Sequence, residues 1–258
     1  MNNVMTVDQR FFGLPFLAPQ GRYAPCSMFS DHHFIASSVS LLTVSLLLLI
    51  TKKKTIGTKT KRCFAVILTL LEGLKISHSF VYGDYYLDAW FPLSYCGLFI
   101  YAIWMSAFFK GKTKRMGDIF IAYGCPIAGL SFLIFPTTSI MLYPVWHYFS
   151  LYSMFFHTAM LFFGISYLRQ ESKLTRKGML TYTVFLTPFV IISCILNTIF
   201  GSNLMNLTEP YNIPIGFLQA IAEISPYLYT LFVFFMFLLI PPVTELMRKT
   251  IKNIKQKR

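Results

Sequence analysis

The sequence predicts an all-α membrane protein, a bundle of seven transmembrane helices with its N-terminus outside and its C-terminus in the cytoplasm. Three observations lead to this fold class. Hydrophobic residues make up 55% of the 258 and charged residues 13%, about half the charged share of a soluble domain. Seven apolar stretches come close to the roughly 20 residues that a helix needs to cross the bilayer core. Basic residues gather in alternate loops between these stretches.

The seven expected spans account for nearly the whole chain, so no separate soluble domain is expected. They cover residues 32–51, 63–82, 90–109, 117–138, 146–168, 178–200 and 218–246. Residues 1–31 are expected to form an outer N-terminal segment, residues 32–247 the membrane domain, and residues 248–258 a basic cytoplasmic tail.

The net charge of +13 is concentrated after the first, third, fifth and seventh spans. Most of the 23 lysine and arginine residues lie in segments 52–62, 110–115, 169–177 and 248–258. The intervening loops, 83–88, 137–144 and 201–217, contain none. This alternation follows the positive-inside rule and sets the predicted orientation. It also predicts contact with anionic lipid head groups, and argues against nucleic acid as a partner.

The outer segment contains an apolar stretch, residues 11–19, that is short and interrupted by prolines. We expect this stretch to lie along the membrane surface. Ser30 and Asp31 precede the first span and predict a helix N-cap there. The five cysteines show no repeated spacing, so neither a disulfide framework nor a metal or cofactor site is expected.

The second span is the first to contain charged residues. Glu72, Lys75, His78 and Tyr82 fall within about 120° of one another on a helix and share one face. A charge near the bilayer centre costs about 2.5–3.5 kcal/mol on insertion scales, so such groups face the protein interior and pair. Glu72 and Lys75, three positions apart, can pair with each other. The pair either orients the helix or borders a wet cavity.

Later spans also have polar or small residues on one side. Gly124, Cys125, Pro126 and Gly129 predict a kink and close helix packing in the fourth span. In the fifth span, His147, Ser150, Ser153 and His157 share one helical face.

The expected topology brings these polar residues to one depth. The outer half of the bundle receives His33, Lys75, His78, Cys96, Asn197 and Glu223, and the middle receives Glu72 and His157. Cys96 lies about 8 Å and His157 about 16 Å below the outer ends of their spans. Such a cluster suits Cys–His nucleophilic chemistry, a metal or haem site, or a pocket for a small solute. A packing role for the same residues also stays open.

The order of the motifs resembles that of the bacterial YwaF-type integral membrane family and of related eukaryotic transmembrane phospholipid acyltransferases. The matching segments are FSDHHF at 29–34, FPLSYC at 91–96, GLSFLIFP at 129–136, SMFFHTA at 153–159 and SPYLY at 225–229. They point to His33, Cys96 and His157. The pair of Glu72 and Lys75, and the series Asn197, Gly201, Asn203 and Pro210, match further parts of the pattern.

The resemblance implies that Cys96 is an acyl-accepting nucleophile and His157 its base. His33, Asn197 and Asn203 are expected to position groups or to stabilise an oxyanion. Two positions depart from the family: Ser94 replaces a histidine, and Phe156 replaces a serine.

We therefore expect a membrane-embedded lipid acyltransferase or acyl hydrolase in the plasma membrane, in particular the bacterial cytoplasmic membrane. Membrane lipids would be its partners and substrates. His78 and Ser94 would complete the lining of its pocket. The alternative is a non-enzymatic transporter or binding bundle for a small solute or lipid that uses Glu72, Lys75 and Glu223.

Overall fold

The computed structural model describes residues 14–51, 55–136, 138–170, 174–211, 213 and 215–256, with side chains to residue 250. This part of the chain forms helices joined by turns and contains no strand. Six helical segments are long and apolar enough to cross a membrane. They are Asp31–Ile50, Thr58–Tyr82, Gly111–Leu142, Tyr148–Gln170, Arg176–Phe200 and Pro226–Thr250.

Four expected spans correspond to single helices. These are α2 (Asp31–Ile50), α3 (Thr58–Tyr82), α9 (Tyr148–Gln170) and α10 (Arg176–Phe200). The predicted cap is confirmed, since the side chain of Ser30 accepts a hydrogen bond from the backbone N–H of His33. Large apolar side chains such as Leu42 and Leu70 are exposed on the outer faces of α2 and α3, as expected for helices that face lipid.

The prediction of one continuous helix over residues 90–109 is wrong. The chain forms the short helix α4 (Leu87–Trp90), passes through turns at residues 91–97, and enters α5 (Leu98–Phe108). Pro92 has no N–H to donate, and its carbonyl accepts a hydrogen bond from the Tyr101 hydroxyl at 3.3 Å. The 11 residues of α5 rise only about 16 Å, about half the thickness of the bilayer core.

The predicted kink in the fourth span is confirmed. The chain forms α6 (Gly111–Tyr123) and α7 (Cys125–Ile134), and Gly124 separates the two helices. The Tyr123 carbonyl at this break accepts a hydrogen bond from Thr244 Oγ1 at 2.8 Å. The predicted close packing is also present: a Cβ added at Gly129 would lie 2.9 Å from the backbone nitrogen of Leu161 on α9. A single turn of helix, α8 (Ser139–Leu142), follows α7.

The expected seventh span is also divided. The amphipathic α11 (Gly216–Ile224) ends at Ser225, and α12 (Pro226–Gln256) starts at the following proline. Because the residue before a proline is disfavoured in helical geometry, the chain breaks there. Glu223 consequently lies on α11 rather than inside a continuous span, and its side chain is exposed.

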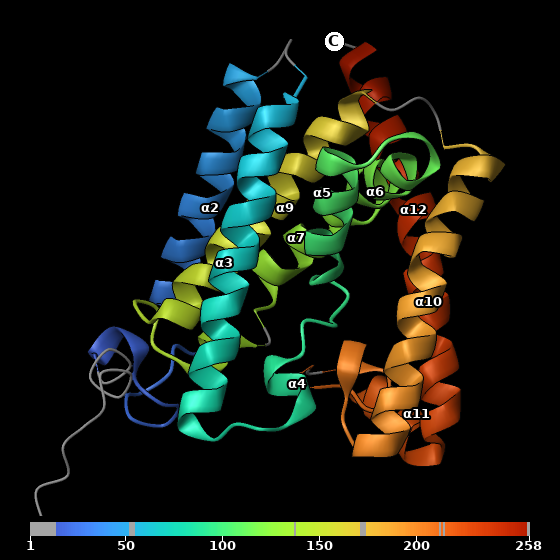
Figure 1. Ribbon diagram of the computed structural model, residues 1–258. Helices are drawn as coiled ribbons and strands as arrows, with labels where there is room; N and C mark the ends of the chain where they lie inside the picture. Colours follow the sequence, from blue (N-terminus) through green and yellow to red (C-terminus); the bar gives the residue numbers. More distant parts are fainter. Residues whose placement is uncertain are drawn as a thin grey trace, which may run out of the picture.

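The carboxyl ends of α2, α5, α9 and α12 and the amino ends of α3, α6 and α10 lie at one end of the bundle, at the top of Figure 1. α4 and α11 lie at the opposite end, as do the turns η1 (Pro15–Leu17) and η2 (Leu204–Asn206). The described basic segments around Lys61, Lys112, Arg176 and Arg248 are therefore at the first end. Residues 1–13, Lys52, Lys53, Lys54, Lys173, Lys257 and Arg258, which also entered the predictions, lie outside the described residues.

Candidate functional site

Cys96 lies in the turn that leads into α5. It is half-buried and packs against the hydrophobic core. The side chain of Ser94 accepts a hydrogen bond from the Gly97 N–H at 2.9 Å within this turn. Within the described part of the chain, the N–H groups of Tyr95 and Cys96 donate to no acceptor. A thiol beside two unused amide donors at the amino end of a helix is an arrangement suited to nucleophilic acyl chemistry.

His157 lies on the buried side of α9. Its Nδ1 atom is 2.7 Å from the Ser153 carbonyl oxygen, and its ring stacks on Phe132 with centroids 3.6 Å apart. A carbonyl only accepts, so Nδ1 carries the hydrogen and Nε2 keeps its lone pair. No described residue forms a hydrogen bond with Nε2. This tautomer leaves Nε2 able to accept a proton.

The thiol of Cys96 and the imidazole of His157 are not hydrogen bonded to each other in this structure. The ring of Phe156 is 5.3 Å from the His157 ring and 5.7 Å from that of Phe99, one helical turn after Cys96. A second thiol, that of Cys125 at the start of α7, lies close enough to Cys96 for an electrostatic interaction. Aromatic rings therefore surround the predicted base, an arrangement that sequence reasoning did not foresee.

Glu72 and Lys75 form the predicted ion pair, with Lys75 Nζ 2.6 Å from Glu72 Oε1. The other carboxylate oxygen accepts a hydrogen bond from the Tyr152 hydroxyl, also at 2.6 Å. Tyr148 stacks beside Tyr152 on α9, with ring centroids 5.9 Å apart. The pair is therefore tied to α9 by a tyrosine that sequence reasoning missed.

The two predicted pocket histidines hold backbone segments in place. His33 Nε2 donates to the Leu133 carbonyl at 3.1 Å, and its Nδ1 accepts from the Phe29 N–H at 3.0 Å. His78 Nε2 donates to the Leu17 carbonyl at 3.0 Å. Both rings are buried. These two side chains join elements that lie far apart in the sequence.

The predicted asparagines fold the connection between α10 and α11. Asn197 accepts from the Leu204 N–H at 2.8 Å and donates to its carbonyl at 3.1 Å. Asn203 accepts from the Thr208 hydroxyl at 2.7 Å. Among the described residues, neither asparagine forms a hydrogen bond with Cys96 or His157. The same holds for Ser94, whose side chain bonds the Gly97 N–H, and for Glu223, which is exposed on α11.

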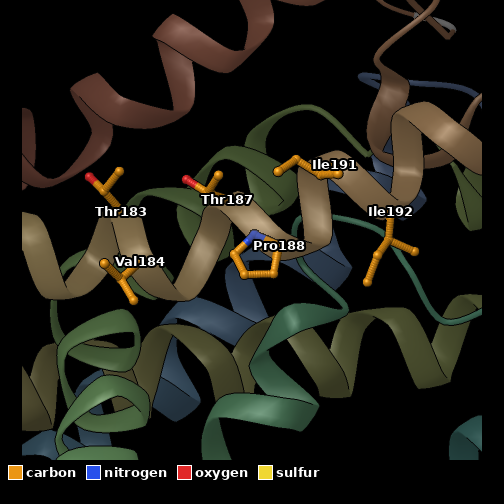
Figure 2. Close-up of a pocket in the computed structure, with 6 residues that line it drawn as sticks. All are labelled: Thr183, Val184, Thr187, Pro188, Ile191 and Ile192. Carbon is orange, nitrogen blue, oxygen red and sulfur yellow. The ribbon is translucent and has the colours of Figure 1, made fainter.

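A concave groove of about 530 Å³ lies on one face of α10. Figure 2 shows its lining residues, all from this helix and mostly apolar: Thr183, Val184, Thr187, Pro188, Ile191 and Ile192. It contains no titratable group. The described residues include no cluster of three or more His, Cys, Asp or Glu side chains that could hold a metal ion.

Comparison with known protein families gives one match. A model described as the TMEM164 family matches residues 28–243. The match includes Cys96, His157 and the ion pair on α3. Comparisons with curated proteins and with solved structures find no match.

Proposed function

The chain belongs to the TMEM164 family, and we propose that it is a membrane-embedded lipid acyltransferase or acyl hydrolase that uses Cys96 and His157. The reaction class comes from the resemblance to the YwaF-type family and the phospholipid acyltransferases. The observation that carries the proposal is the position of Cys96 at the amino end of α5, beside two unused N–H groups.

The proposed topology has seven crossings, with the N-terminus outside and the C-terminus in the cytoplasm. The third crossing combines the turns at 91–97 with α5. Backbone outside a helix at membrane depth must be buried in protein or line a polar cavity, and this supports a chamber around Cys96. The clustering of described basic residues at one end supports a cytoplasmic end that contacts anionic head groups. We propose the plasma membrane, and specifically the bacterial cytoplasmic membrane, as the location.

In the first half of the reaction, Nε2 of His157 takes the proton of the Cys96 thiol. The thiolate attacks the acyl carbonyl carbon of a lipid ester, and the carbonyl electron pair moves onto oxygen. The N–H groups of Tyr95 and Cys96 donate to this oxyanion. When the carbonyl reforms, the ester bond breaks, and the alcohol leaves with the proton from His157. The acyl chain is then a thioester on Cys96.

In the second half, Nε2 of His157 takes a proton from an acceptor alcohol or from water. The resulting oxygen nucleophile attacks the thioester carbonyl, the C–S bond breaks, and the thiolate regains the proton. An alcohol gives acyl transfer and water gives hydrolysis. The reaction requires Nε2 to reach the thiol, so the Phe156 ring has to turn away from its contacts with Phe99 and His157.

Substrate lipids are proposed to enter sideways from the bilayer. The groove on α10 is apolar and open toward the lipid, so it suits an acyl chain rather than a head group. The thiol and imidazole are placed inside the bundle, where water is limited. This arrangement favours transfer between lipids over release of free acid.

The test uses the purified full chain in lipid nanodiscs with 4-nitrophenyl decanoate as probe. Nitrophenolate release is measured for the wild type, Cys96→Ala and His157→Ala. The matched control is Cys194→Ala, which removes a half-buried thiol from α10. We expect Cys194→Ala to react as the wild type does, and the other two variants to lose the activity. Equal release by all four proteins, each shown to be folded, contradicts the proposal.

A second candidate function is a binding or transport site for a small solute at Glu72. It is favoured by the buried carboxylate with both oxygens engaged, one by Lys75 and one by Tyr152. Intramembrane charges often mark such pathways. Under this alternative, Glu72→Gln abolishes uptake or binding in vesicles and Cys96→Ser has no effect. The exposed position of Glu223 gives that residue no part in this site.

A further inference from the structure

The N-terminal residues 14–30, here called the strap, cover one end of the helix bundle. Leu17 and Ala18 are both only 2% exposed, so this part of the strap is buried among the helices. Leu14 and Phe16 are 49% and 42% exposed. The strap is thus partly inserted: Leu17 and Ala18 lie inside the bundle, and their apolar neighbours Leu14 and Phe16 face outward.

Two histidines hold the inserted part through its backbone. His78 Nε2 donates to the Leu17 carbonyl, and His147 Nε2 donates to the Ala18 carbonyl, both at 3.0 Å. The two imidazole rings are 6.1 Å apart. The strap is otherwise attached by few polar contacts, among them the Cys26 N–H to the Tyr143 carbonyl at 3.1 Å.

The strap lies over the buried network of Glu72. The Phe16 ring is 5.9 Å from the ring of Tyr148. Tyr148 stacks on Tyr152, whose hydroxyl donates to Glu72. A chain of three side chains therefore leads from the strap to the ion pair, and detachment of the strap would open this end of the bundle toward Glu72.

The contacts of His147 are made by its neutral form only. Nε2 donates to Ala18, while Nδ1 accepts from the Phe149 N–H at 3.2 Å. A proton on Nδ1 would put an N–H directly opposite the N–H of Phe149. The added positive charge would also lie next to the amino end of α9, where the helix dipole disfavours it. The ring is 1% exposed and stacks on Tyr143 at 4.3 Å. Burial lowers the pKa of His147 to about 4.

Few charged groups offset a proton on His147. From α3 it faces His78, which itself stacks near Tyr82, and from the preceding loop it faces Tyr143. Asp84, after α3, is electrostatically coupled to His78 and to Tyr143. Among the described residues, other groups reach His147 only through these neighbours. Arg22 of the strap interacts electrostatically with Tyr82, and Tyr211 and Asp84 interact electrostatically with Tyr143. The neighbouring imidazole disfavours the added charge.

We propose that the strap is a pH-sensitive lid: a proton on Nδ1 of His147 breaks the contacts with Phe149 and Ala18, and residues 14–30 detach from the bundle. The detached state lets water and solutes reach Tyr148, Tyr152 and Glu72. The proposal concerns only the strap and its histidines. It stands whether or not Cys96 is a nucleophile.

Cys26 is a native reporter of the strap. Its side chain is 8% exposed, and its Sγ is 3.1 Å from Ser30 Oγ. The full chain in nanodiscs is treated with N-ethylmaleimide between pH 5 and 7, and peptide mass spectrometry measures the alkylation rate of Cys26. The reference is the thiol introduced by Tyr86→Cys, a position 79% exposed at the same end. The ratio of the two rates removes the intrinsic pH dependence of thiol alkylation.

Linkage sets the expected size of the effect. With a pKa of about 4 in the closed state and 6.5 in the released one, the normalised rate rises roughly 20-fold from pH 7 to pH 5. His147→Gln keeps a donor for Ala18 and cannot be protonated, so its rate rises less than that of the wild type, with His78 at Leu17 as the remaining titratable anchor. The matched variant His33→Gln keeps the rise, because His33 contacts the strap only at Phe29 and otherwise anchors Leu133, away from the inserted Leu17 and Ala18.

Three results overturn the proposal. One is a constant Cys26 rate in the wild type, which needs no variant to interpret. Another is a rise of the same size in folded His147→Gln as in the wild type. The third is a rise that disappears in His33→Gln and remains in His147→Gln, because the titrating group would then be His33 rather than His147.

Discussion

Replacing Gly129 by alanine tests the close approach of α7 and α9. The added Cβ would lie 2.9 Å from the Leu161 backbone nitrogen and 3.0 Å from the His157 carbonyl oxygen. Ordinary van der Waals contact begins at 3.4 Å, so the two helices have to separate locally by about half an ångström. The nearest atoms belong to backbone, which cannot rotate away as a flexible side chain can.

The size of the effect follows from two opposing contributions. Overpacking a tight interior contact costs about 1–3 kcal/mol. Replacing a helical glycine by alanine gains about 1 kcal/mol through helix propensity. We therefore expect Gly129→Ala to lower the free energy of unfolding by about 1 kcal/mol. The control is Gly73→Ala on α3, where no atom lies within 4 Å of the added Cβ. It should raise the free energy of unfolding by about 1 kcal/mol.

The assay is reversible unfolding of both variants in mixed detergent micelles with increasing sodium dodecyl sulfate, followed by circular dichroism. The reasoning predicts that the two midpoints move in opposite directions. Equal stabilisation of both proteins would mean that α7 and α9 are not in close contact at Gly129, and the reasoning would then fail.

Three further predictions use the same unfolding assay. Tyr152→Phe leaves a Glu72 oxygen without its donor and should cost about 1.5–3 kcal/mol; no loss would mean that water replaces the hydroxyl. The lowered pKa of His147 means that the unfolded chain binds more protons, so stability should fall from pH 6.5 to about 4 and fall less in His147→Gln; equal slopes would contradict this. Ser94→Ala removes the acceptor of the Gly97 N–H in the turn that leads into α5 and should cost about 1 kcal/mol, whereas Ser94→Thr should not; equal losses would mean that this hydrogen bond does not stabilise the turn.

Local signals in the sequence were sufficient for much of the fold. The apolar runs located α2, α3, α9 and α10, and a serine at residue 30 located the start of α2. Gly124 and Pro126 located the break between α6 and α7 because each weakens a helix through its own backbone. The pair of Glu72 and Lys75 was also predictable, since two residues three positions apart on a helix are neighbours.

The interruptions at residues 91–97 and at Ser225 were harder to predict. The start of α12 had a local signal in Pro226, but the apolar run around this proline favoured one continuous helix. The turns at 91–97 include a contact over nine positions, from the Tyr101 hydroxyl to the Pro92 carbonyl. Hydropathy does not register such a contact, so residues 90–109 were predicted as one helix.

The partners of the candidate site residues could not be derived from helical faces. Helical periodicity gives the side of a helix on which a residue lies, but not the atom opposite it. His33 meets a carbonyl 100 positions away, and His147 meets one 129 positions away. Phe132, which stacks on the His157 ring, is likewise a tertiary neighbour. The predicted shared pocket accordingly becomes several local networks in the structure.

The measurement that tests the central claim most directly is the mass of the Cys96 peptide after a brief reaction with 4-nitrophenyl decanoate. The account predicts a hydroxylamine-sensitive decanoyl group on Cys96 in the wild type, and its absence or slow formation in His157→Ala. An unmodified Cys96 in a protein that still hydrolyses the ester would contradict it. A decanoyl group that forms equally fast without His157 would do so too.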